Sequence, residues 1–569
     1  MEKMKKMKNK SFKQRTKVIV VSILLLVSSV TLISFDDKEF KIAKNLDIFF
    51  TLFRELNLFY VDNTDPKELI EAGIEGMLKS LDPYTTYIPE TEIDDFNFIT
   101  TGQYGGIGAL IRKAGDYTII SEPYKEFPAY KAGLIAGDTV ITIDGIPTTG
   151  KKIRNVSEML KGIPKTSVKL EIKRYKEEGI LEKTLIREKI TIKNVPYFGV
   201  FENNIGYIKL SNFTKDAGKE VKSALIALKK ENVESIILDL RGNPGGLLIE
   251  SVNVANLFTD KGQEIVSTRG KVKKWDNVYK TLQPAVDTLI PLVILVNRGS
   301  ASASEIVAGS LQDLDRAVII GKRTFGKGLV QTSRPLSYNT QLKVTTAKYY
   351  IPSGRCIQAV DYTHRNEDGS VGYIPDSLIN EYETKNGRKV LDGGGITPDI
   401  TVETDHPGSI TISLFTKNLI FDYATIYVAE NKSINYSDEF EFTDNDYQQF
   451  LKFLENKDID YTTQSDENLK ELIDVAKKEK YYKDAIEEFE ALEKKLAHDK
   501  NKDLQTFKDE IIHLLTEEIS CRYEYQEGRV KASLKKDVQF DKAIEVLKNK
   551  DEYFAILKGI TDKTDSANL

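Results

Sequence analysis

A serine and a lysine within one short block of this chain have the side chains and the surroundings that nucleophilic catalysis requires. Ser302 follows an apolar run, residues 291–296, that predicts a buried strand, and it precedes apolar residues at helical spacing. At a helix N-terminus the free backbone amides and the helix dipole stabilise a developing negative charge. Ser302 is therefore the candidate nucleophile.

A serine nucleophile needs a base that takes its proton. The four histidines all lie outside the block: His364, His406, His498 and His513. A Ser-His-Asp arrangement has no local support, so Lys327, in a glycine-flanked turn after a second apolar strand, is the natural substitute. A lysine acts as a base only when it is neutral, which requires burial and a partner that fixes its amine. Gln331, on the same face of the strand predicted to follow, and Glu305 are the two candidate partners.

A glycine-rich turn, Gly242–Gly246, follows the strand predicted for residues 235–240 and precedes a helix-like run. Amides at such a turn point outward as donors and suit a negatively charged oxygen. Each feature has a plainer interpretation when taken alone, because glycines form ordinary tight turns, serines cap helices and turn lysines are usually solvated. The combination of the motifs decides between the two interpretations.

Three segments together resemble the C-terminal processing peptidases, also called tail-specific peptidases. They are Gly299–Gly309 (GSASASEIVAG), Arg323–Gln331 (RTFGKGLVQ) and Leu238–Leu247 (LDLRGNPGGL). The resemblance implies a Ser-Lys endopeptidase whose α/β core is of the crotonase and Clp-peptidase type. It implies Ser302 as nucleophile, Lys327 as general base and Gln331 as the group that orients the lysine. It also implies an oxyanion hole made by the backbone amides of Ala303 and Gly246.

A second module is expected upstream, over residues 97–192, where strand-like alternation is interrupted by turn signals. Its segments Pro128–Asp138 and Val140–Gly145 resemble a PDZ domain. Such a domain adds an extended peptide to a sheet edge and binds the terminal carboxylate with the amides of a glycine-rich loop. That loop would consist of Gly105, Gly106, Ile107 and Gly108.

The length of 569 residues exceeds what one hydrophobic core supports, so several domains are expected. The fold class is multidomain α/β and α+β, with helical regions at both ends. The expected boundaries are 1–35 for a signal peptide or anchor, 36–96 for a helical domain, 97–192 for the PDZ-like domain, 193–405 for the peptidase core and 406–569 for a helical extension.

The N-terminus carries a targeting signal. A lysine-rich segment precedes Val18–Phe35, which is uncharged and mostly apolar. No Ala-x-Ala cleavage pattern and no lipid-accepting cysteine follow, which favours an uncleaved anchor over a cleaved signal peptide. The basic flank would remain in the cytoplasm, so the peptidase would lie in the periplasm or on the outer face of the cytoplasmic membrane.

Composition narrows the functional classes further. The net charge of −5 argues against a general nucleic-acid-binding protein. The two cysteines, Cys356 and Cys521, lack metal-ligand spacing, and no nucleotide motif is present. We therefore expect neither a metal nor another cofactor.

The extension 406–569 is rich in Lys, Glu and Asp, with apolar residues at helical spacing, which predicts a helical bundle. It could dock a regulatory or adaptor protein, cover the active site or extend a homodimer, although charged helices are often only surface. The dimer is implied by the family resemblance alone.

The favoured function is an exported endopeptidase whose PDZ-like domain binds unstructured C-terminal tails of proteins. The alternative is a catalytically silent PDZ scaffold that recruits such tails at the membrane. A third interpretation, a Ser-Lys hydrolase of non-protein amides or esters, is disfavoured by the peptide-binding module.

Overall fold

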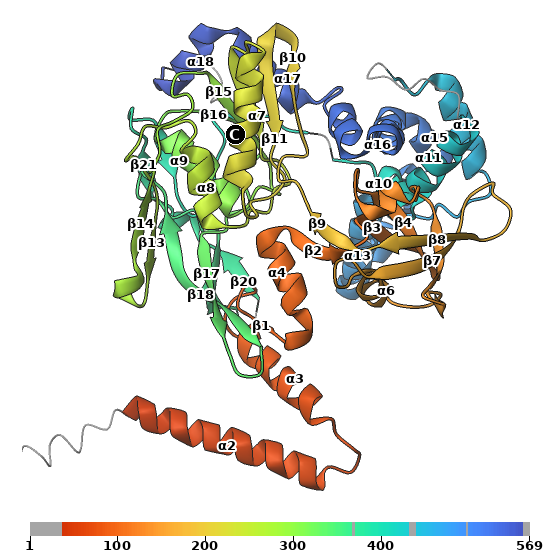
Figure 1. Cartoon of the computed structure of the whole chain (residues 1–569), viewed down its shortest axis with the longest axis horizontal. Helices are drawn as coiled ribbons and strands as arrows, with labels where there is room; N and C mark the ends of the chain where they lie inside the picture. Colours follow the sequence, from red (N-terminus) through yellow and green to blue (C-terminus); the bar gives the residue numbers. More distant parts are fainter. Residues whose placement is uncertain (1–36, 367–369, 405, 432–439, 497–498, 561–569) are drawn as a thin grey trace, which may run out of the picture. The chain divides into compact units, whose positions relative to one another are not determined.

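The computed structural model describes residues 37–366, 370–404, 406–431, 440–496 and 499–560 (Figure 1). The chain divides into two compact units, with the boundary after Tyr87. The apolar stretch that predicts a signal or anchor lies outside the described residues. Among the residues that are described, no helix combines the length and the apolar character needed to cross a membrane.

The first unit contains the helices α2 (Asp37–Phe59) and α3 (Pro66–Lys79). Asp65 caps α3 by accepting a hydrogen bond from the Lys67 N–H at 2.7 Å, and Pro66 occupies the first helical position, where its missing N–H costs nothing. The boundary expected between residues 96 and 97 falls inside helix α4 (Ile93–Thr101), which lies in the second unit.

The core of the second unit is a six-stranded sheet in the order β10-β11-β12-β15-β16-β23. Its strands are β10 (Tyr197–Phe201), β11 (Ile205–Lys209), β12 (Ser235–Asp239), β15 (Leu292–Val296), β16 (Val318–Gly321) and β23 (Ile400–Thr401). All neighbours are parallel except β10 and β11. The central strands are uniformly apolar because both faces of the sheet are buried.

Helices from distant parts of the chain cover the two faces of this sheet. One face packs against α7 (Ala217–Lys230), α8 (Leu248–Ala255) and α9 (Ala303–Asp313). The other packs against α17 (Val538–Lys548) and α18 (Lys550–Leu557). Helices α17 and α18, which fall within the helical extension expected for residues 406–569, therefore supply a layer of the α/β core.

A second sheet stands beside the core and carries the lysine segment. It contains β13 (Glu264–Gly270), β14 (Asn277–Lys280), β17 (Leu329–Pro335) and β18 (Gln341–Tyr350). The antiparallel pair β17 and β18 has a bulge between Val330 and Gln331. A bulge shifts the alternation of side chains, so the facing of Gln331 cannot be obtained by counting residues from Lys327.

The PDZ module is a sheet in the order β3-β4-β5-β7-β8 with β6 beside β5. Its strands are β3 (Ala109–Ala114), β4 (Tyr117–Pro123), β5 (Thr139–Ile143), β6 (Ile146–Pro147), β7 (Ser167–Lys173) and β8 (Leu181–Ile186). Helices α5 (Pro128–Lys131) and α6 (Ile153–Leu160) complete it, and Val156 and Leu160 of α6 are buried in its core. The paired strands β2 (Gln103–Gly106) and β9 (Glu188–Thr191) form its base.

A helical domain follows the core, with its own aromatic-rich interior. It consists of α10 (Ser409–Thr416), α11 (Leu419–Glu430), α12 (Asp444–Leu454), α13 (Gln464–Glu479), α14 (Ile486–Leu496), α15 (Lys500–Thr506) and α16 (Lys508–Ser533). Helix α16 is kinked at Tyr525, where the backbone has φ 57° and ψ −141°. After the kink the chain continues into α17, so α16 joins the helical domain to the core.

Helix α16 also contacts the PDZ module. Glu122 of β4 is only 4% exposed, accepts from the Cys521 thiol at 3.2 Å and lies 3.5 Å from the Arg529 guanidinium. The Arg112 guanidinium of β3 stacks 3.8 Å above the Phe421 ring of α11. The helical domain therefore holds the PDZ module by buried and specific contacts.

The packing of α17 on the sheet can be tested at Phe540. This ring is 4% exposed and lies 5.0 Å from the Phe201 ring and 5.6 Å from the Tyr207 ring, centroid to centroid. We expect Phe540→Ala to lower the free energy of unfolding by about 3–5 kcal/mol. Phe554→Ala, at a ring that is 45% exposed on α18, should cost much less. Equal losses in denaturant titrations would contradict this packing.

Candidate active site

Ser302 occupies a strained turn between β15 and α9. Its φ of 55° and ψ of −112° are rare for a residue with a side chain and cost free energy that the surroundings must supply. A sharp turn between a strand and a helix exposes a serine hydroxyl, as in the nucleophile elbow of the α/β-hydrolases. The sequence predicted the handover from strand to helix at Ser302, and the structure adds the strain.

The carboxylate of Glu305 fixes this turn to the lysine turn. Glu305 is fully buried. Its Oε2 accepts from the backbone N–H of Ser302 at 2.8 Å and of Lys327 at 2.9 Å. Its Oε1 accepts from the Gly326 N–H at 2.7 Å and from the Thr324 hydroxyl at 2.6 Å. One side chain thus holds the candidate nucleophile and the candidate base in register.

Glu305 was one of two candidates for orienting the Lys327 amine. Two carboxylate oxygens offer about four acceptor positions, and four donors already occupy them. Three of these donors are backbone N–H groups, so Glu305 fixes the backbone of the serine turn and of the lysine turn. Gln331 is the other candidate, and its amide Nε2 donates to the Thr345 hydroxyl of β18 at 3.1 Å.

Tyr349 makes a second bridge between the two turns. Its side chain is 1% exposed, and its hydroxyl donates to the carbonyl oxygen of Lys327 and lies 3.2 Å from that of Ser302. We did not assign it a role from sequence. Two adjacent tyrosines, Tyr349 and Tyr350, give no indication in the sequence of which one faces the site.

The glycine turn packs directly against the serine turn. A Cβ on Gly245 would lie 2.6 Å from the Ala301 carbonyl oxygen, and one on Gly246 would lie 2.3 Å from the Phe213 carbonyl oxygen. Gly245 also has φ +97°, which favours glycine. Within the described residues, the N–H groups of Gly246 and Ala303 have no hydrogen-bond acceptor. Two open donors therefore flank Ser302.

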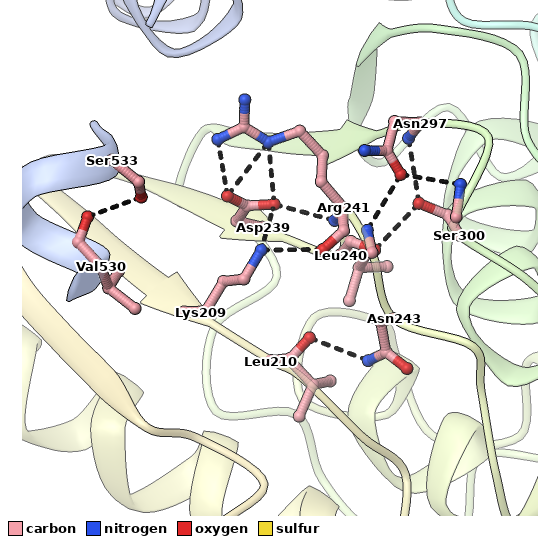
Figure 2. Close-up of polar contacts among 12 residues, drawn as sticks. Lys209, Leu210, Asp239, Leu240, Arg241, Asn243, Asn297, Ser300, Val530 and Ser533 are labelled. Atoms are coloured by element: carbon pink, nitrogen blue, oxygen red, sulfur yellow. Dashed lines mark hydrogen bonds and ion pairs between the residues drawn. The ribbon is translucent and has the colours of Figure 1, made fainter. Parts of the chain in front are cut away.

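A buried ionic network anchors the start of this glycine turn at the end of β12 (Figure 2). The Asp239 carboxylate, 1% exposed, binds Arg241 at 2.7 Å, Lys209 at 3.2 Å and the Tyr207 hydroxyl at 2.8 Å. Burial alone would raise the pKa of Asp239, but the two cations hold it well below its ordinary range. The carboxylate therefore stays charged and keeps Arg241 in place.

Polar side chains on the neighbouring loops complete the anchoring of the turn. Asn297 Oδ1 accepts from the Gly242 N–H at 2.9 Å, and the Ser300 hydroxyl donates to the Leu240 carbonyl at 2.9 Å (Figure 2). Ser304 donates to the Asn243 carbonyl at 2.9 Å. Ser300 and Ser304 therefore tie the serine segment to the glycine turn, and neither is a rival nucleophile.

Ser302, Lys327, Gln331 and Gly246 line one cleft of about 570 Å³. Much of its remaining wall is apolar, contributed by Phe96, Phe98, Ile99, Leu247, Leu248, Ile306, Leu329 and Val330. The side chains from α4 could not be assigned to this wall from sequence, because nothing in the local pattern indicates which distant loop a short helix covers.

The predicted carboxylate loop lies in the PDZ module, and none of its residues lines this cleft. Gly105 and Gly106 form the end of β2 and pair with β9, which leaves Ile107 and Gly108 as the free connection to β3. Within the described residues, the N–H groups of Ile107 and Gly108 have no acceptor. Gly108 has φ +73°, and a Cβ there would lie 2.5 Å from the Phe127 Cβ. A side chain at position 108 would therefore collide with Phe127.

Comparison with known families finds three matches along the chain. Residues 204–365 match peptidase family S41, residues 119–174 match a PDZ domain, and residues 410–547 match the C-terminal helical domain of probable PDZ-proteases. The first match contains Ser302 and Lys327.

Individual relatives agree with these matches. A carboxy-terminal-processing protease from Bartonella bacilliformis is 36% identical over 346 residues, which cover 60% of this chain and 78% of the relative. A probable CtpA-like serine protease from Staphylococcus aureus is 31% identical over 457 residues, covering 77% and 82%. A solved photosystem II D1 C-terminal processing protease is 27% identical with a TM-score of 0.34, covering 62% of this chain and 92% of that one.

The charge of Glu305 gives a testable pH dependence of stability. Burial raises its pKa from 4.5 to about 7, although its four hydrogen bonds oppose the shift. Between these two pH values the unfolded chain releases a proton that the folded chain keeps, so this group destabilises the fold as the pH rises. The free energy of unfolding should therefore fall, relative to Glu305→Gln, by roughly 3 kcal/mol from pH 4.5 to 7. Parallel pH profiles in denaturant titrations would refute the assignment.

Proposed function

Because the chain belongs to peptidase family S41 and is a carboxy-terminal processing serine protease with a PDZ domain, we propose that Ser302 is its nucleophile and Lys327 its general base. The observation that carries this proposal is the strained Ser302 turn, which shares one cleft with Lys327 and is flanked by two open amide donors.

The proposed reaction begins when neutral Lys327 takes the proton of the Ser302 hydroxyl as its Oγ attacks a peptide carbonyl. The N–H groups of Gly246 and Ala303 would stabilise the oxyanion that forms, because both lack an acceptor among the described residues and both belong to turns that are already fixed. Lys327 then gives its proton to the departing amine. Water, deprotonated by the same lysine, releases the acyl group from Ser302.

Gln331 is the proposed orienting group for the lysine. Its Nε2 is engaged by Thr345, so its Oε1 is the atom that would accept a hydrogen bond from the Lys327 amine. This hydrogen bond would hold the Lys327 side chain in one rotamer. It would offset part of the conformational entropy that the long side chain loses when it is ordered.

The proposed substrates are unstructured C-terminal tails of proteins. Strand β3 pairs only with β4 among the described strands, so its other edge can accept a peptide as an added strand. The open amides of Ile107 and Gly108 stand at the start of this edge and suit a terminal carboxylate. The apolar wall of the cleft favours small or medium apolar side chains next to the cleaved bond.

We further propose that the enzyme acts outside the cytoplasm, at the membrane or in the periplasm. The support is the lysine-rich segment before the apolar stretch Val18–Phe35. A homodimer and an adaptor bound to the helical domain belong to the same proposal.

Substitution of the two reacting groups tests the catalytic assignment. Ser302→Ala and Lys327→Ala should each lower kcat/KM on an unfolded protein with an apolar C-terminus by about 10³-fold or more, because each removes a group that the covalent step requires. Ser223→Ala and Lys348→Ala, on exposed positions of α7 and β18, are the matched controls. Normal cleavage by Ser302→Ala would refute the assignment.

Tail recognition is tested separately with the inactive Ser302→Ala protein. A peptide with a free C-terminal carboxylate should bind at least about tenfold more tightly than the same peptide with an amidated C-terminus, since hydrogen bonds to a charged group are lost. Isothermal titration calorimetry measures both affinities. Equal affinities would show that the loop at Ile107 and Gly108 does not bind the carboxylate.

A further inference from the structure

A short loop, residues 211–215, lies between the base of the PDZ module and the glycine turn of the cleft. The two chain segments that enter and leave the module meet at its base, where the Ile192 N–H donates to the Gly102 carbonyl at 2.9 Å. The loop contacts both of them. The Lys215 N–H donates to the Thr100 carbonyl at 3.2 Å, and a Cβ on Gly102 would lie 2.8 Å from the Thr214 hydroxyl oxygen.

Asn194, in the segment that leaves the module, holds this loop most firmly. It is 1% exposed, and its side chain uses all four of its hydrogen-bonding positions. Oδ1 accepts from both the N–H and the hydroxyl of Thr214 at 2.9 Å. Nδ2 donates to Glu220 Oε1 at 2.8 Å and to the Lys215 carbonyl at 3.4 Å. These partners also determine which end of the amide is oxygen and which is nitrogen.

The other side of the loop touches the glycine turn. The Phe213 N–H donates to the Gly245 carbonyl at 3.2 Å, and the Leu247 N–H donates to the Phe213 carbonyl at 2.7 Å. Phe213 therefore pairs with both peptide groups that flank Gly246, and its side chain is fully buried. Glycine accepts almost any backbone conformation, so the direction of the Gly246 N–H is set by these two hydrogen bonds.

We propose that Asn194 is a positioning residue for the reaction. It holds loop 211–215 where Phe213 directs the Gly246 N–H into the cleft, and it thereby links the base of the PDZ module to an oxyanion donor. This inference rests on the proposed function, because it gives Asn194 a role only if Gly246 stabilises an oxyanion. It predicts an effect on kcat and not on the binding of the tail.

The variant Asn194→Asp isolates one half of the network. The oxygen that accepts from Thr214 is kept. The Nδ2 group that donates to Glu220 is replaced by a second carboxylate oxygen, which faces the Glu220 carboxylate. We expect kcat to fall about 10²-fold, the range seen when an oxyanion donor is lost or displaced. KM should change less than threefold. The affinity for a free-carboxylate tail peptide, measured in the Ser302→Ala background, should not change.

The double variant Asn194→Asp with Glu220→Gln supplies the matched control. The new glutamine can donate to the new aspartate while its oxygen still accepts from the Val195 N–H, which lies 3.0 Å from Glu220 in the parent. The same hydrogen bond is then restored with the donor and acceptor exchanged. We expect kcat to recover at least tenfold relative to Asn194→Asp, which a loss of fold alone would not allow.

Different results would overturn the role of Asn194 and the proposed function. Parental kcat in Asn194→Asp would overturn the inference, and so would equal impairment of the single and double variants. A selective rise in KM or loss of tail affinity would also overturn it, because Asn194 would then act on binding. If instead Ser302→Ala cleaves like the parent, the proposed function itself fails and the inference falls with it.

Discussion

The buried carboxylate of Glu305 is the interaction on which the rest of the site depends. Burial disfavours its charged form and raises its pKa to about 7, and the four donors that converge on it oppose that shift. Three of those donors are backbone amides from turns that lie more than twenty residues apart in sequence. The hydrogen bonds that offset part of the cost of burial therefore also hold the Ser302 and Lys327 turns together, and Tyr349 bridges the same two turns.

The second constraint is the need to cover both faces of a parallel sheet. Strands β11, β12, β15 and β16 are apolar on both sides, so the core cannot be completed by the helices that alternate with them. Helices α17 and α18 provide the missing layer. Helix α16 leads into them and also contacts Glu122 of the PDZ module. The packing of α17 and α18 on the core therefore brings the helical domain beside that module.

Much of the candidate site could be predicted because its residues lie in short contiguous sequence motifs. Ser302, Lys327, Gln331 and Gly246 do share a cleft, and the strand and helix on either side of Ser302 are where the apolar periodicity indicated. Their catalytic roles remain predictions. Other features were beyond the sequence because they depend on long-range geometry. The hydrogen bond from the Ser302 N–H to Glu305 is a local capping contact. The hydrogen bonds from the Gly326 and Lys327 amides to the same carboxylate span more than twenty residues, and the bulge at Gln331 leaves no mark in the sequence pattern.

For the same reason, the sequence alone does not indicate a role for Asn194. An asparagine after a predicted strand usually marks a turn, and only the fold reveals that its amide is buried and saturated between Thr214 and Glu220. Its position has a mechanical consequence. The PDZ module is joined to the core by two adjacent chain segments, and both contact the loop that pairs with the glycine turn. Any displacement of the module that moves this base would also move the loop, and through Phe213 it would act on the glycine turn.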